Sequence, residues 1–108
     1  MIRETEGAIR GLLYTDAQSL AAEMVEGVRE HGVEDAKGYA LNFAIREDGI
    51  RATSRSTSVI ANLVADVRRG VAIAAVDALT EYEAREIDSD PAEWLADRMH
   101  FRLTDIVR

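Results

Sequence analysis

Hydrophobic residues recur every three or four positions within residues 15–31, which predicts an amphipathic helix. This helix is expected to begin at Thr15, which forms a capping-box pattern with Gln18. It is expected to end before Gly32, because glycine readily adopts the left-handed conformation that closes a helix. Residues 3–13 predict only a short helix or an irregular arm, since two glycines weaken helix formation there.

The pattern changes to a period of two over residues 39–56, which is typical of β-strands. Leu41 and Ile45 belong to a series of apolar residues that alternates with polar or small ones. The dipeptide Asp48-Gly49 favours a two-residue type I′ turn, which requires positive φ angles. The segment therefore predicts a β-hairpin with one apolar and one polar face.

Helical spacing returns in the second half of the chain. Residues 58–87 predict a long helix, and its segment 71–79 is apolar on nearly all sides, as in helices that are buried or lie at an interface. A straight helix of that length spans about 45 Å, whereas a compact chain of this size is about 34 Å across. A bend near Gly70 or a projecting helix is therefore expected. A last helix is predicted to begin at Asp90, with Pro91 in its first turn.

These elements predict a single α+β domain over residues 1–108. It is expected to be mostly helical, with about four helices and one β-hairpin inserted before the long third helix. Because two strands alone are only marginally stable, the hairpin must pack on the helices or gain strands from a second copy.

Charge adds information about the environment of the protein. The chain has 20 acidic and 13 basic residues, with a net charge of −7, and Lys37 is its only lysine. This composition fits a halophilic source, where salt screens the carboxylates, or a GC-rich genome. Most of the acid excess lies in residues 80–97, with a net charge of −6, and residues 98–108 carry +2.

The candidate chemistry is sparse. The chain has no cysteine, which excludes disulfides, thiolate zinc sites and a cysteine nucleophile. It has no phosphate-binding or nucleophile motif, and a structural role is expected for His31 and His100. We therefore expect a protein that is not an enzyme, with no cofactor and no metal. With no apolar span and no signal-peptide order in its first residues, it is expected in the cytoplasm or in a virus particle assembled there.

Three arginines suggest a binding surface. Arg46, Arg51 and Arg55 share one face of the predicted hairpin, and guanidinium groups match phosphate well. A β-ribbon can enter the major groove of DNA, but the acidic net charge opposes that interaction. An acidic surface on a partner protein or a second copy is the favoured alternative.

Apolar residues suggest a second binding surface. Val71, Ile73 and Val76 lie in the all-round apolar segment, and Trp94, the only tryptophan, is of the type that anchors interfaces. The predicted function is a non-enzymatic assembly or adaptor subunit that forms a homo-oligomer or docks in a larger complex, such as a virion connector. The alternative is a nucleic-acid-associated regulator that uses the arginine-bearing hairpin.

Overall fold

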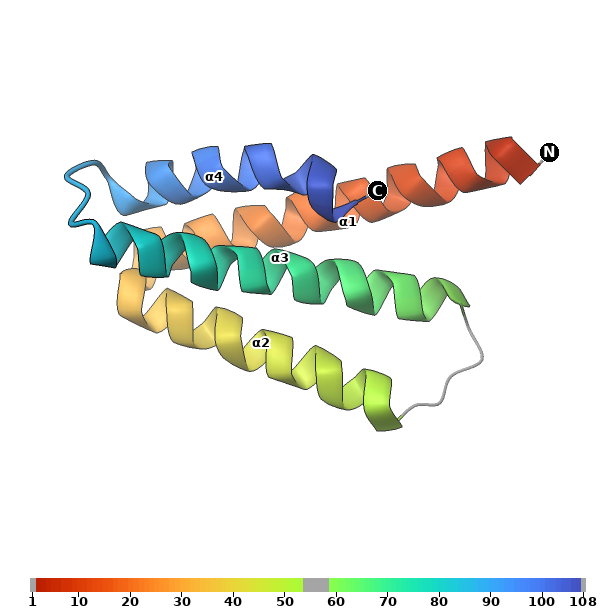
Figure 1. Cartoon of the computed structure of the whole chain (residues 1–108), viewed down its shortest axis with the longest axis horizontal. Helices are drawn as coiled ribbons and strands as arrows, with labels where there is room; N and C mark the ends of the chain where they lie inside the picture. Colours follow the sequence, from red (N-terminus) through yellow and green to blue (C-terminus); the bar gives the residue numbers. More distant parts are fainter. Residues whose placement is uncertain (1, 54–58, 108) are drawn as a thin grey trace.

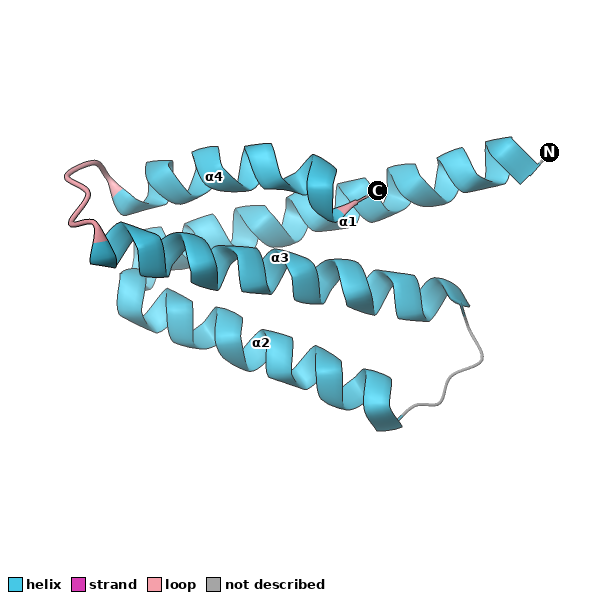
Figure 2. Ribbon diagram, in the orientation of Figure 1, coloured by secondary structure: helices cyan, strands magenta, loops and turns pink. Residues whose placement is uncertain are grey.

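The computed structural model describes residues 2–53 and 59–107 of the chain, with side chains for residues 7–49 and 61–107. The regular structure in these ranges is entirely helical (Figure 2). The described elements are α1 (Ile2–His31), α2 (Val33–Thr53), α3 (Val59–Ala84) and α4 (Pro91–Ile106).

Successive helices run in opposite directions and form an up-down-up-down four-helix bundle (Figure 1). Helices α2 and α4 lie on opposite sides of the α1–α3 pair, and α2 packs mainly on α3. The molecule is elongated, with extents of 48 × 30 × 21 Å. The N-terminal part of α1 extends past the end of the shorter α4 (Figure 1).

The large side chains of the core come from α1, α3 and α4, and α2 adds alanines. Burial of apolar side chains at helical spacing supplies most of the driving force for such a bundle. The largest fully buried side chains are Leu20 of α1, Val71 and Leu79 of α3, and Leu95 and Met99 of α4. Helix α2 contributes only smaller side chains to the fully buried set, a difference that shapes the candidate site.

The first helix is longer than the sequence indicated. Thr15 does not cap a helix: its hydroxyl donates to the Gly11 carbonyl oxygen at 3.0 Å, one turn earlier inside α1. The two separate segments expected on either side of Thr15 are therefore one continuous helix. Its end is as predicted, because Gly32 has a φ of +88° and its amide donates to the Val28 carbonyl oxygen.

The predicted β-hairpin and the α+β class are wrong, because the chain from Val33 to Thr53 is the single helix α2. The remainder of the hairpin segment lies outside the described residues. The same part of the chain carries a second pattern, a stripe of alanines four residues apart (Ala36, Ala40 and Ala44), which is buried. Alanine has the highest helix propensity and packs closely, so this stripe outweighs the turn preference of Asp48-Gly49.

The second half of the chain follows the predicted pattern more closely. Helix α3 continues through Gly70, and the elongated bundle accommodates its full length. Helix α4 has Asp90 at its N-cap position and Pro91 in its first turn, as predicted. None of the helices in the described ranges is both long enough and apolar enough to cross a membrane.

Candidate functional site

Helix α2 places its small apolar residues inside the bundle and two of its large ones outside. Ala36, Ala40 and Ala44 are buried, whereas Leu41 and Ile45 are 50% and 60% exposed. Fully burying a leucine or isoleucine side chain is worth about 1.5–3 kcal/mol. In the isolated chain, the exposed side chains of Leu41 and Ile45 contribute only part of this stabilisation.

The middle of α2 is also free of charge. Residues 38–45 contain no acidic or basic side chain in a protein in which 31% of residues are charged. Gly38 and Asn42 are exposed beside Leu41 and Ile45. We call these four residues the α2 outer face. Two exposed apolar side chains one turn apart, Leu41 and Ile45, in an uncharged stretch of a charged protein favour an interaction surface.

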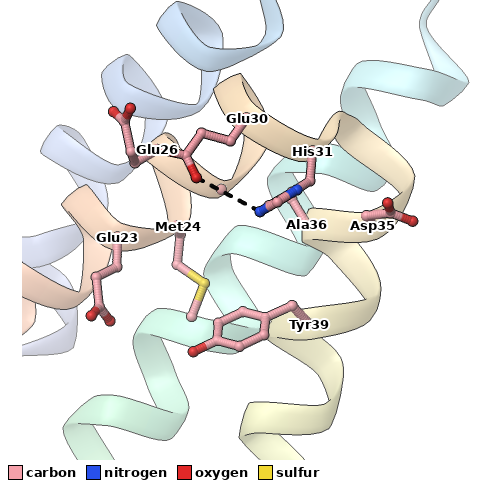
Figure 3. A pocket seen from close by; sticks show the side chains of 9 residues that line it. Glu23, Met24, Glu26, Glu30, His31, Asp35, Ala36 and Tyr39 are labelled. Carbon is pink, nitrogen blue, oxygen red and sulfur yellow. Dashed lines mark ion pairs between the residues drawn. The ribbon is translucent and has the colours of Figure 1, made fainter.

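A pocket of about 370 Å³ lies between the end of α1 and the start of α2 (Figure 3). Its floor includes Met24, Gly27 and Ala36, and the Met24 side chain points toward the Tyr39 ring. The pocket exists because α1 and α2 turn sharply at Gly32 and bring these side chains together. It combines an apolar floor with an aromatic wall.

Carboxylates surround this pocket. The acidic residues that line it are Glu23, Glu26, Glu30 and Asp35. Glu26 accepts a hydrogen bond from the Arg29 Nη1 at 2.7 Å, and Glu30 Oε2 lies 3.7 Å from the His31 Nε2. Glu23 and Asp35 make no ion pair within the described part of the chain. The pocket therefore has a negative rim that would attract a cation.

The pocket belongs to a strongly acidic end of the bundle. The α1–α2 turn and the α3–α4 loop lie at the same end (Figure 1). Residues 23–37 carry a net charge of −3 and residues 81–97 carry −6, which leaves +2 for the remainder of the chain. The bundle thus has an uneven distribution of charge along its long axis.

The only lysine links the two antiparallel helices at this acidic end. Lys37 Nζ donates to Glu83 Oε1 at 2.6 Å and joins α2 to α3. This hydrogen bond to Glu83 raises the pKa of Lys37 above its usual value of 10.5, and the charges of Glu83 and Glu34 act in the same direction. The charged ammonium group of Lys37 therefore connects α2 to α3.

The predicted arginine surface depended on the hairpin, which does not form. Arg46 is exposed on α2, the side chain of Arg51 is not among those described, and Arg55 lies outside the described residues. In a helix, positions 46 and 51 are separated by about 140° around the axis. They therefore do not share one face, as they would on the two paired strands of the predicted hairpin.

The apolar residues predicted to bind a partner lie in different places. Val71 is completely buried inside the chain, and Ile73 and Val76 are partly buried against the core. The all-round apolar character of this part of α3 is thus explained largely by its three helical neighbours.

Trp94 is partly buried in a small aromatic cluster. Its ring meets the Tyr82 ring edge-on, with centroids 5.6 Å apart, and the Arg98 guanidinium lies 4.7 Å from its centroid. These contacts join α3 to α4 beside the loop. Trp94 therefore has a structural role within the chain.

Sequence reasoning missed the α2 outer face and the acid-rimmed pocket. The spacing of Ala36, Ala40 and Ala44 by four residues was the signal that could have revealed the helix. The pocket had no sequence signal, because it depends on how α1 and α2 meet.

No group of three or more His, Asp or Glu residues is placed to hold a metal ion in the part of the chain that the structure describes. Comparison with protein-family models, with curated proteins and with solved structures finds no significant match to this chain.

Proposed function

We propose that this protein is a non-enzymatic assembly module that self-associates through the α2 outer face. The observation that supports this proposal is the inverted arrangement of α2, with alanines inside and with Leu41 and Ile45 outside. These two residues are one helical turn apart, the spacing that apolar anchors use when one helix docks against another.

The charge distribution favours the same surface for contact between copies. Each copy carries a net charge of −7, so two copies repel each other over most of their surfaces. The α2 outer face brings no charged side chain of its own into the contact. Molar salt screens the remaining repulsion, since the Debye length falls to about 3 Å. Self-association is therefore expected to strengthen as potassium chloride is raised.

The test is the molar mass in solution, measured by light scattering after size exclusion at low salt and in molar potassium chloride. The wild type is expected to be oligomeric at high salt. The variant Leu41→Gln/Ile45→Gln is expected to be monomeric there. A wild type that stays monomeric at both salt concentrations would contradict the proposal.

A matched control removes two exposed apolar side chains from other helices. Leu12 of α1 is 72% exposed and Phe101 of α4 is 74% exposed. The variant Leu12→Gln/Phe101→Gln is expected to retain the mass of the wild type. Equal loss of association in both variants would point to general hydrophobicity and not to α2.

A further inference from the structure

One flank of α2 carries an acid and a base in a fixed relationship. Asp35 and Arg46 are both exposed, and neither makes an ion pair within the described residues. Their separation of 11 positions corresponds to about three helical turns, so the two positions differ by only about 20° around the axis. Their midpoint along α2 is level with Leu41, and Asn42 of the α2 outer face lies within about 40° of both positions around the axis.

We propose that two copies pair α2 against α2 in antiparallel orientation, with Arg46 of each copy entering the acid-rimmed pocket of the other beside Asp35. This inference rests on the self-association proposed above and specifies its geometry. In a two-fold contact, if residue i of the first copy meets residue j of the second, residue j of the first copy also meets residue i of the second. With the two-fold axis level with the midpoint of residues 35 and 46, Asp35 of one copy lies opposite Arg46 of the other.

The pocket has the chemistry that a guanidinium group needs. Its rim offers the Asp35 and Glu23 carboxylates, and among the residues that the structure describes no arginine or lysine lines it. The half-exposed ring of Tyr39 forms one wall, and a guanidinium group binds well over an aromatic face (Figure 3). The planar fork of arginine can also bind a carboxylate through two hydrogen bonds.

The other charges near the contact are compatible with this arrangement. Glu34 and Asp48 each lie within about 20° of Leu41 around the axis, so Glu34 of one copy would approach Asp48 of the second copy. The Asp48 carboxylate already lies 2.7 Å from the Arg69 Nε of its own chain, which reduces the repulsion. The antiparallel orientation also directs the acidic ends of the two bundles in opposite directions, away from each other.

A charge exchange tests this geometry. Arg46→Glu brings a second carboxylate against Asp35, and Asp35→Arg brings a second guanidinium against Arg46. Each single variant is therefore expected to weaken its own dimer by about tenfold or more. Mixing the two variants creates a heterodimer with two different contacts. In one contact, the unchanged Asp35 of the first variant meets the unchanged Arg46 of the second. In the other, the introduced Glu at position 46 of the first variant meets the introduced Arg at position 35 of the second. The double variant Asp35→Arg/Arg46→Glu restores opposite charges in a homodimer. Arg102→Glu on α4 is the matched control, with the same change of charge at another exposed arginine.

The readout is the dimer dissociation constant from sedimentation equilibrium, measured at the lowest salt concentration at which the wild type dimerises, because ion pairs are screened least there. Circular dichroism verifies that each variant keeps its helices. Recovery of association on mixing, with Arg102→Glu unaffected, supports the inference. If the wild type associates and both single variants associate equally well, this geometry is overturned and the proposed function stands. If the Leu41→Gln/Ile45→Gln variant also associates like the wild type, the proposed function fails as well.

Discussion

Gly70 of α3 and Ile106 of α4 are packed so closely that a Cβ atom on Gly70 would lie 3.1 Å from the Ile106 Cγ2. The other glycines with described surroundings have nothing within 4 Å of such an atom. The glycine in the middle of α3 is therefore explained by the approach of the last turn of α4. This contact also fixes how far α4 reaches along α3.

Alanine substitution at Gly70 is expected to stabilise the protein less than the same substitution at Gly11. Replacing glycine by alanine in a helix interior gains about 1 kcal/mol, and Gly11 has open space for the added methyl group. At Gly70 the Ile106 side chain must move, which offsets part of that gain. In an Ile106→Ala background the full gain at Gly70 is expected. Urea unfolding of the four members of this cycle measures the coupling.

The alanine stripe of α2 predicts a steric limit on this helix. Ala40 is completely buried, so Ala40→Leu is expected to force α2 away from α3 and to lower the free energy of unfolding by about 1–3 kcal/mol. Ala22→Leu on the exposed side of α1 is the control, because alanine and leucine have similar helix propensities. Chemical denaturation followed by Trp94 fluorescence compares them. Equal stabilities would show that α2 does not pack tightly through its alanines.

The sequence predicted those parts of the fold whose signals are local. Pro91 marks the start of α4 and Gly32 the end of α1, because helix ends depend on a few neighbouring residues. Asp90 occupies the N-cap position, but its side chain makes no capping hydrogen bond. Thr15 was misleading because a threonine hydroxyl can cap a helix or bond to the carbonyl one turn back, and only the surrounding structure selects between them.

The candidate site could not be predicted because it depends on tertiary packing. The spacing of Leu41 and Ile45 fits one face of a strand and also one face of a helix. Their exposure is decided by the docking of Ala40 and its neighbours on α3. The acid-rimmed pocket needs the turn at Gly32 to bring α1 and α2 together. Neither the exposure of Leu41 and Ile45 nor the position of the pocket follows from the spacing of residues along one segment.

The turn between α1 and α2 gives a prediction of opposite sign to that at Gly11. Gly32 has a φ of +88°, where an L-residue with a side chain is strained. Gly32→Ala is expected to lower the free energy of unfolding by about 1 kcal/mol. Gly32→Asn is expected to cost less, because asparagine tolerates this conformation better. Thermal unfolding monitored by circular dichroism ranks the three proteins, and a neutral Gly32→Ala would contradict the helix-ending role of this residue.

The ion pair between Lys37 and Glu83 predicts a loss of stability at alkaline pH. The pKa of Lys37 is higher in the folded protein than its usual 10.5, because Glu83 accepts a hydrogen bond from the charged ammonium. The stabilisation is therefore fully present below pH 10.5 and is lost as the pH rises through the folded-state pKa. The difference in unfolding free energy between wild type and Lys37→Met is expected to shrink over that interval.

Arg85 provides the control for this pH dependence. Its Nη1 donates to the Glu81 Oε1 at 2.8 Å, but a guanidinium group stays charged to pH values above about 12. The difference between wild type and Arg85→Met should therefore stay constant where the Lys37→Met difference falls. Urea unfolding at a series of pH values from about 8 to 11.5 compares the two variants, on either side of the usual lysine pKa. A Lys37→Met difference that is constant across this range would show that the Lys37 ammonium does not stabilise the junction of α2 and α3.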